Sequence, residues 1–425
     1  MSGPLGHRTF RFLLAGRGVS MLGTAIAPVA IAFAVLDLTG SPAALGIVLA
    51  ARSIPQVALM LIGGVISDRF DRSRVLVVAN LVAGAAQAAA AVLLLTGSAS
   101  IPTLAILEAV NGAASALVFP AAAAITPQTV PASMLQQANA TLRLVLNAAV
   151  IAGASAGGLL VAHVGPGWGL VVDAVAYTVA AAMFARITLR DTGVTSDRVA
   201  VEAATGTAEA VAAQVSVLRG VWADLQVGWR EVTSRTWLWS VVLAFSFANA
   251  AQAAGWHTLG PVVADRTFGP SGWGFVLAAQ TAGMFGGALV LLRFRPRRPL
   301  FFGCAAILLW VPMLVVLAVE PRLTLLLPVA FVAGLGFEAF GVFWDLSLQQ
   351  RVPSDRLARV YSFDAVGSYA MIPIGQLAAG PLAALAGVPA GVFASAMVIT
   401  AAITASLFVP SVRRLERTGI TPAAR

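Results

Sequence analysis

The chain has 425 residues, of which 59% are apolar and only 11% charged, and its formal net charge is +9. A mean hydropathy of +0.88 excludes an ordinary water-soluble protein of this size, which would need more polar surface. Its single cysteine, Cys304, excludes an internal disulfide framework and a cysteine-based metal site.

Twelve apolar runs are long enough to cross a bilayer, which takes about 20 residues per helix. The first run continues past the one candidate cleavage site, at 25–27, which favours a membrane span over a cleavable signal peptide. The sequence therefore predicts an all-α membrane protein. The expected spans are 12–37, 42–66, 75–96, 101–124, 139–162, 168–189, 237–260, 271–292, 299–319, 323–347, 361–386 and 389–410.

The positive charge follows the predicted topology. All 27 basic residues are arginines, and most of them lie on the side of the predicted spans that also holds both ends of the chain. By the positive-inside rule we expect both termini and the central loop in the cytoplasm. The charge thus reports membrane orientation, and a nucleic-acid partner is not expected.

An internal repeat divides the chain. The segment 128–135, before the fifth predicted span, recurs as 350–357 before the eleventh, and the same offset carries Gly153 to Gly375 and Gly158 to Gly380. A shared register in loop and helices predicts two parallel six-helix repeats. The expected parts are a six-helix half at 1–190, a cytoplasmic linker with a short amphipathic helix at 191–235, a second six-helix half at 236–412 and a cytoplasmic tail at 413–425.

Four ionisable side chains lie well inside predicted spans: Arg17, Arg52, Glu108 and Glu338. Each costs about 2.5 to 3.5 kcal/mol near mid-membrane, so each is a functional candidate. An apolar cavity disfavours a charged carboxylate, which makes the two glutamates candidates for proton coupling. Structural roles stay open: Arg17 can snorkel to the interface, Arg52 can pair with a neighbouring acid, and either glutamate can belong to a satisfied ion pair.

Four aspartates are expected toward span ends, where water is close, and carry less weight. Asp364 is retained because it is expected to open the eleventh helix, where the helix dipole favours a carboxylate. The set is Asp37, Asp173, Asp345 and Asp364.

A charged loop follows the second predicted span, with the spacing G-x-x-x-D-R and further arginines. It resembles the signature loop between the second and third helices of the major facilitator superfamily, although Asp71 replaces its usual glycine and Ser73 its usual basic residue. The resemblance implies a gating hinge whose contacts form in one transport state and break in the other. For the arginines, a purely topological role stays open. The residues of this hinge are Gly64, Asp68, Arg69, Arg72 and Arg74, with Asp364 as a further member.

The same resemblance implies that the first, fourth, seventh and tenth helices line a central cavity. This adds Asn249, Gln252 and His257 to Arg17, Glu108 and Glu338 as cavity candidates. The family's antiporters usually carry an arginine in the fourth helix, where this chain has Glu108, which puts the usual coupling scheme in question.

Glycines in the fifth helix resemble the glycine-rich motif of drug/proton antiporters, with Ala154 in place of its proline. Close helix packing is the alternative role. The glycines assigned to packing are Gly153, Gly157, Gly158, Gly375 and Gly380.

Three loose motifs, at 36–42, 130–140 and 352–360, resemble the efflux branch that includes macrolide and enterobactin exporters. The resemblance implies a secondary transporter of the cell (inner) membrane that exports a small hydrophobic or amphipathic compound in exchange for protons. An importer or facilitator without proton exchange stays open, as does a non-transporting membrane sensor. No nucleophile and base set, phosphate loop or metal-ligand cluster is present, so neither an enzyme nor a cofactor is expected. The expected partners are the small-molecule substrate, protons and the lipid bilayer.

Overall fold

The computed structural model describes residues 3–69, 71–187 and 230–416, and these ranges contain helices and no strand. Within them, 12 helical segments are long and apolar enough to cross a membrane, which confirms the all-helical membrane fold expected from the sequence. The linker and its amphipathic helix, predicted from Leu218, lie almost entirely outside the described residues.

The first half consists of six long helices joined by short turns. Gly40, with φ of 61°, ends the first helix, and Ser100 begins the fourth through a capping box with Thr103. The helices are α1 (Arg8–Thr39), α2 (Pro42–Arg69), α3 (Arg72–Leu95), α4 (Ile101–Thr129), α5 (Leu135–Val164) and α6 (Pro166–Phe184), with short 3₁₀ helices at Pro4–Gly6 and Ala132–Met134.

In the second half, three of the predicted continuous spans are interrupted. The seventh span contains a π-helical segment, η3, and the ninth and eleventh break into two helices each. The interruptions lie one turn before Pro261, Pro312 and Pro373, where a proline ring clashes with the carbonyl four residues back. The elements are α9 (Thr236–Gln252), η3 (Ala253–Thr258), α10 (Leu259–Arg266), α11 (Gly269–Leu291), α12 (Pro299–Ile307), α13 (Trp310–Val319), α14 (Leu323–Arg351), α15 (Ser354–Tyr369), α16 (Ile372–Ala386), α17 (Val388–Phe408) and α18 (Pro410–Arg413).

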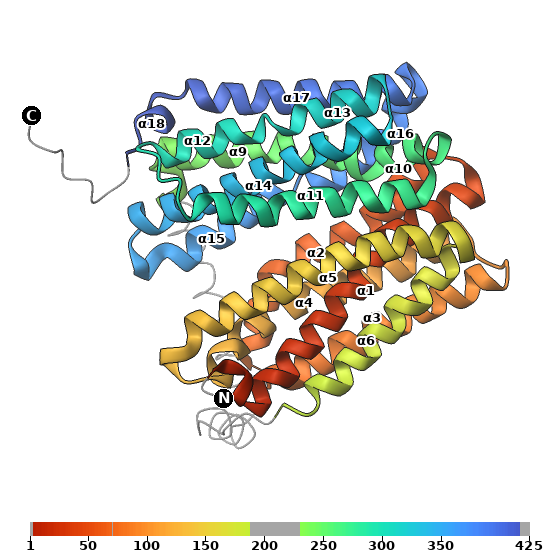
Figure 1. The fold of residues 1–425 in the computed structure, drawn as a ribbon, viewed down its shortest axis with the longest axis horizontal. Coiled ribbons are helices and arrows are strands. Elements are labelled where there is room, and N and C mark those ends of the chain that lie inside the picture. Colours follow the sequence, from red (N-terminus) through yellow and green to blue (C-terminus); the bar gives the residue numbers. More distant parts are fainter. Residues whose placement is uncertain (1–2, 70, 188–229, 417–425) are drawn as a thin grey trace, which may run out of the picture.

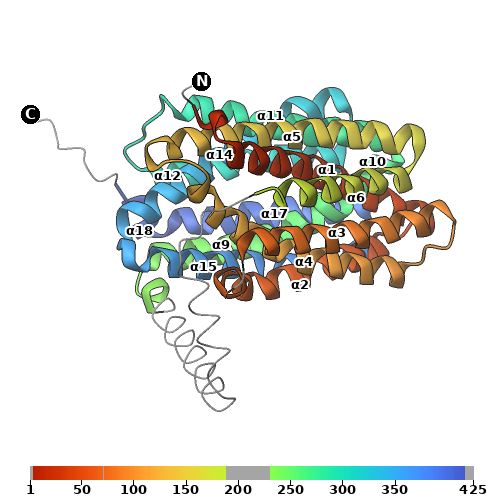
Figure 2. The same ribbon diagram turned by 90° about the horizontal axis from the view of Figure 1, so that it is seen from below.

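The two halves form separate bundles that meet toward one end. Helices α1 to α6 make one bundle and α9 to α17 the other, and the start of α1 and helix α18 lie at the opposite end from the α1–α2 turn (Figure 1). Figure 2 shows the same bundles from below, with α11 beside α5. The halves pack through α2 against α16 and through α5 against α11.

Among the described residues, the apolar core is continuous between the halves near the α1–α2 turn. Phe33 and Leu45 from the first half share one buried cluster with Trp256 and Leu259 from the second. At the other end, the core of the first half is a separate cluster containing Leu13, Leu76, Ile125 and Phe184. The halves are therefore joined by hydrophobic packing at one end of the molecule.

Glycines allow this close contact between halves. A Cβ added at Gly46 would lie 2.2 Å from the carbonyl oxygen of Gln376, and one at Gly158 would lie 2.9 Å from the Cα of Gly274. The glycines assigned to packing all lie at close helix approaches, and two of them, Gly158 and Gly380, face the other half. The nearest atom to an added Cβ is the Leu22 oxygen for Gly153 (2.5 Å), Ile26 Cα for Gly157 (3.0 Å), the Pro270 oxygen for Gly158 (2.6 Å), the Ala250 oxygen for Gly375 (1.9 Å) and Ala43 Cβ for Gly380 (2.5 Å).

Candidate functional site

A polar cluster lies inside the bundle of the first half. Arg52 on α2 and Glu108 on α4 form an ion pair, with Nη1 and Oε2 3.2 Å apart, and their side chains are 18% and 2% exposed. The other carboxylate oxygen of Glu108 accepts a hydrogen bond from Nε2 of Gln87 on α3, at 3.2 Å. Glu108 is therefore a fully paired carboxylate, the arrangement that a buried charge requires.

The cluster contains a second acid, Asp173 on α6. The expectation that Asp173 lies near a span end, close to water, is wrong, because it lies about two turns into α6 and is 0% exposed. The charges of Arg52 and Glu108 both act on it. Among the described residues, neither of its oxygens has a hydrogen-bond partner; Gln87 borders both acids but donates to Glu108.

Two hydroxyl groups lead from this acid toward the edge of the bundle. Tyr177 lies one turn after Asp173 on α6 and is 4% exposed. Its hydroxyl oxygen lies 3.1 Å from Oγ1 of Thr24 on α1, whose side chain is half-buried. The spacing of Asp173 and Tyr177, four residues apart on one helical face, was the sequence signal for this part of the cluster.

The candidates of the seventh helix lie elsewhere. Asn249 and Gln252 line a small cavity inside the second bundle, together with Phe245, Trp310 and Phe337. Asn249 also donates from Nδ2 to the carbonyl oxygen of Ser368 at 2.9 Å. The expectation that these residues share a cavity wall with Glu108 is therefore wrong, because Glu108 is enclosed by its own bundle.

The remaining cavity candidates are partly accessible. His257 lies in the π-helical segment η3 with an exposed side chain, and Arg17 is half-buried on α1. No hydrogen bond or ion pair joins Arg17 to another residue of the described part of the chain. Glu338, half-buried on α14, lies against Gly287 of α11, and the charge of Arg143 on α5 acts on it from the other half.

The hinge is a short turn between α2, which ends at Arg69, and α3, which begins at Arg72. Both departures from the family signature make hydrogen bonds here. Asp71 caps α3 by accepting from the backbone nitrogen of Arg74 at 2.9 Å, and Ser73 donates to the carbonyl oxygen of Phe184 at 2.9 Å. The helix α2 includes Gly64, Asp68 and Arg69, but their side-chain environments lie outside what the structure describes.

Asp364 does not open the eleventh helix, as expected from the sequence. Helix α15 begins at Ser354, so Asp364 lies in its interior. Its carboxylate accepts hydrogen bonds from Nε1 of Trp344 at 2.8 Å and from Oγ of Ser368 at 3.1 Å. The bond from Trp344 fixes α15 against α14, whereas Ser368 lies on α15 itself, one turn after Asp364.

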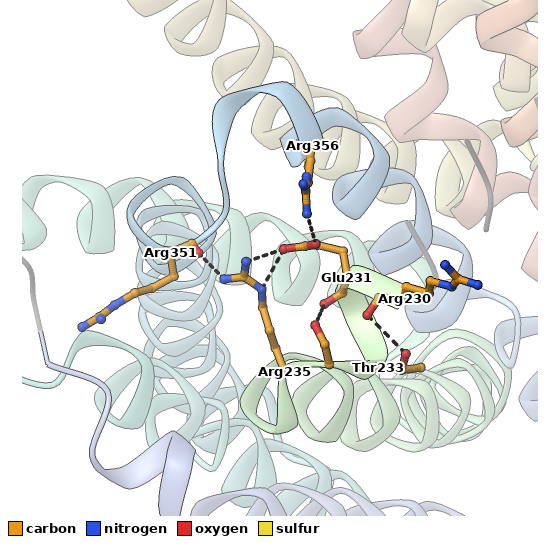
Figure 3. A network of polar contacts seen from close by, with 7 residues as sticks. Arg230, Glu231, Thr233, Arg235, Arg351 and Arg356 are labelled. Carbon is orange, nitrogen blue, oxygen red and sulfur yellow. Dashed lines mark hydrogen bonds and ion pairs between the residues drawn. The ribbon is translucent and has the colours of Figure 1, made fainter. Parts of the chain in front are cut away.

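A second ionic cluster joins three elements at the end of the second bundle that holds the start of α9 (Figure 3). Glu231 pairs with Arg235 through Oε1 and with Arg356 through Oε2, the latter at 2.8 Å, and Arg235 also donates to the carbonyl oxygen of Arg351. The hydrogen bonds from Arg356 and then Arg235 hold the pKa of Glu231 below its usual range. We call Glu231, Arg235, Arg351 and Arg356 the Glu231 clamp.

Comparison with known proteins places this architecture in a family. The model of the Major Facilitator Superfamily matches residues 13–376. The chain belongs to this superfamily. It is therefore a membrane transporter and not an enzyme.

The transporter is similar over its full length to curated efflux pumps. It is 27% identical over 423 residues to the multidrug efflux pump Tap of Mycolicibacterium fortuitum, with 97% of each chain covered. It is 26% identical over 413 residues to the pump of the same name from Mycobacterium tuberculosis (strain ATCC 25618 / H37Rv), covering 95% of this chain and 92% of the relative.

Solved structures share the fold. The nucleoside transporter NupG gives a TM-score of 0.73 at 12% identity and covers 96% of this chain and 100% of that chain. A bacterial homolog of the human lysosomal transporter Spinster, in an inward-facing and occupied conformation, gives 0.71 at 16% identity with 98% of each chain covered. At these identities the likeness concerns the fold alone.

Proposed function

We propose that the transporter exports small hydrophobic or amphipathic compounds in exchange for protons, by alternating access between its two halves. The observation that carries the proton coupling is the cluster inside the first half, where one arginine, Arg52, is enclosed with two acids, Glu108 and Asp173. A buried cluster with more acids than bases is neutral only when it holds a dissociable proton. Such a cluster can therefore exchange a proton with water as its surroundings change.

The packing of the halves supports alternating access. They share an apolar core near the α1–α2 turn and have separate cores at the other end. If the arginine distribution sets the orientation, both termini are cytoplasmic and the joined end faces outward. The structure then corresponds to a state open to the cytoplasm, from which an exporter loads its substrate. The relatives named as multidrug efflux pumps support a location in the cell membrane.

The side chains around the small cavity in the second half suit a hydrophobic compound, but at about 20 Å³ the cavity itself is too small to hold one in this conformation. Aromatic rings of Phe245, Trp310 and Phe337 line it, and Asn249 and Gln252 add polar groups. Binding of a substrate here would require the cavity to widen during the transport cycle, because small-molecule sites measure about 300 to 1,000 Å³. The relatives named as multidrug efflux pumps favour export over import.

The test is substrate-triggered proton movement. Purified full-length protein in liposomes with an imposed pH gradient is challenged with a panel of hydrophobic dyes and antibiotics that includes ethidium, while internal pH and labelled compound are followed. Antiport predicts proton movement opposite to each transported compound. Movement of compound without protons contradicts antiport and favours the facilitator. A protein that moves nothing from the panel contradicts multidrug export and favours the sensor.

A further inference from the structure

We infer that Asp173 is the group that carries the exchanged proton, and that it is a neutral carboxylic acid in this conformation. The inference rests on the proposed antiport and identifies the acid within it. The sequence drew attention to Glu108, but the contacts of the two acids point to Asp173.

The hydrogen bonds of the two acids differ. Glu108 receives one bond from Arg52 and one from Gln87, so its ionised form is paired on both oxygens. Asp173 is 0% exposed, and no hydrogen bond of normal geometry reaches either of its oxygens from the described residues, because Gln87, the donor that borders it, is bonded to Glu108. A carboxylate without donors in an apolar interior is strongly unfavourable, whereas a neutral carboxyl group is tolerated. The proton therefore resides on Asp173.

The surrounding charges support the same assignment. Arg52 and Glu108 neutralise one another, so an ionised Asp173 leaves the cluster with a net negative charge. Among the described residues, no other charged group acts on Asp173 from the helices packed on α6: α1 contributes Gly23, α3 contributes Gln87, and α5 contributes none. Losing the proton thus requires a change in this neighbourhood, such as a shift of Arg52 toward Asp173.

The proton has a route to the edge of the bundle. The hydroxyl group of Tyr177, on the same face of α6, interacts electrostatically with Asp173 and lies 3.1 Å from Oγ1 of Thr24. Hydroxyl groups both donate and accept. Tyr177 makes no hydrogen bond with Asp173 in this conformation, so the O–H bond of Asp173 breaks by transfer to an intervening water molecule, which passes a proton to Tyr177 as Tyr177 passes its own to Thr24 and on to water. Both hydroxyls end neutral and Asp173 ends as a carboxylate, and reprotonation reverses each transfer.

The first test needs no substrate. Infrared difference spectra between neutral and alkaline pH are recorded for wild type, Asp173→Asn and the control Asp345→Asn, which alters another acid within a span, hydrogen-bonded to Tyr361 at 3.0 Å. We expect a protonated-carboxyl signal in wild type and the control that is lost in Asp173→Asn. Survival of that signal in Asp173→Asn overturns the inference.

A chemical probe covers the case in which Asp173→Asn does not fold. Dicyclohexylcarbodiimide reacts with protonated carboxyl groups in apolar surroundings, and mass spectrometry of wild-type peptides locates the product. We expect modification of Asp173 at neutral pH that declines at alkaline pH. Modification of Glu108 in place of Asp173 overturns the inference.

The transport assay then separates this inference from the proposed function. With ethidium as the probe, we expect Asp173→Asn to exchange labelled compound across the membrane without proton movement. Proton movement by Asp173→Asn equal to wild type overturns the assignment of Asp173 and leaves antiport intact. Ethidium transport by wild type without protons contradicts antiport, and with it the exchange role of Asp173, while the infrared signal still reports its protonation.

Discussion

The guanidinium group of Arg52 and the carboxylate of Glu108 meet where α2 crosses α4 at its closest. A Cβ added at Gly112, one turn after Glu108, would lie 2.0 Å from the carbonyl oxygen of Arg52. The backbone contact and the 3.2 Å ion pair therefore belong to one crossing point. The backbone contact therefore holds the two side chains beside one another in this conformation.

Removing one partner of this pair should lower the free energy of unfolding by more than removing both partners. We expect Glu108→Gln to destabilise the transporter by about 3 kcal/mol, because Arg52 is left without its counter-charge. The double variant Arg52→Gln/Glu108→Gln should recover part of that loss. Thermal unfolding in detergent for both single variants and the double variant provides the cycle. Losses that simply add would contradict an energetic coupling between the two side chains.

The contact between Gly158 and Gly274 should tolerate no side chain. An added Cβ at Gly158 would lie 2.6 Å from the Pro270 oxygen and 2.9 Å from Gly274 Cα, so Gly158→Ala forces the halves apart. We expect a loss of about 1 to 3 kcal/mol in stability of the joined form, and reduced transport. Measurements are the melting temperature and the rate of dye efflux.

Gly341 is the matched control for this substitution. It also lies inside a long helix, α14, but an added Cβ would meet nothing within 4 Å. We expect Gly341→Ala to leave transport unchanged and to stabilise the helix by up to about 1 kcal/mol. Equal losses in the two variants would point to a general intolerance of helix glycines and not to contact between the halves.

The Glu231 clamp should make stability depend on acidic pH. Two arginines hold the pKa of Glu231 below its ordinary value. The stabilisation is therefore complete above the unfolded pKa of about 4.3 and is lost as pH falls through the lowered folded value. Melting curves of wild type and Glu231→Gln should differ at neutral pH and converge as the pH falls below about 4.

Glu320 provides the control for the clamp. It pairs with Arg322 at 3.0 Å, but the two side chains are 48% and 73% exposed. Such a surface pair contributes about 0 to 1 kcal/mol. We expect Glu320→Gln to melt like wild type at every pH. A fall in melting temperature as large as that of Glu231→Gln would show that burial is not the reason why the clamp stabilises the protein.

The number of spans and the charged candidate residues could be predicted from the sequence. Hydrophobicity and the free-energy cost of placing a charged side chain in lipid both depend on the local sequence. Arg52 and Glu108 were found in this way, and their pairing was one of the alternatives. Asp173 was underrated because its apolar run was placed at 168–189, whereas α6 spans Pro166–Phe184. How deeply a side chain is buried also depends on the neighbouring helices, and a run of apolar residues carries no information about those neighbours.

The same reasoning could not predict where helices are interrupted or which residues line a cavity. The prolines at 261, 312 and 373 were visible, but Pro28 and Pro55 lie inside uninterrupted helices, so proline alone does not predict a break. Which face of α9 carries Asn249 toward α15 depends on rotation about the helix axis. Rotation is set by packing among helices distant in the sequence, as is the hydrogen bond of Trp344 to Asp364.

The interaction between Arg143 and Glu338 should respond to exchange of the two charges. They lie on α5 and α14, from opposite halves, and the charge of Arg143 acts on Glu338. Arg143→Glu places like charges together, which should shift the balance between transport states by about 1.4 kcal/mol, or roughly tenfold. We expect slower dye efflux in Arg143→Glu and recovery in Arg143→Glu/Glu338→Arg. Recovery would identify an attraction between the halves that the transport cycle uses. Failure of the exchanged pair to recover, with both variants folded, would mean that Glu338 acts through its own carboxyl group and not through its charge toward Arg143.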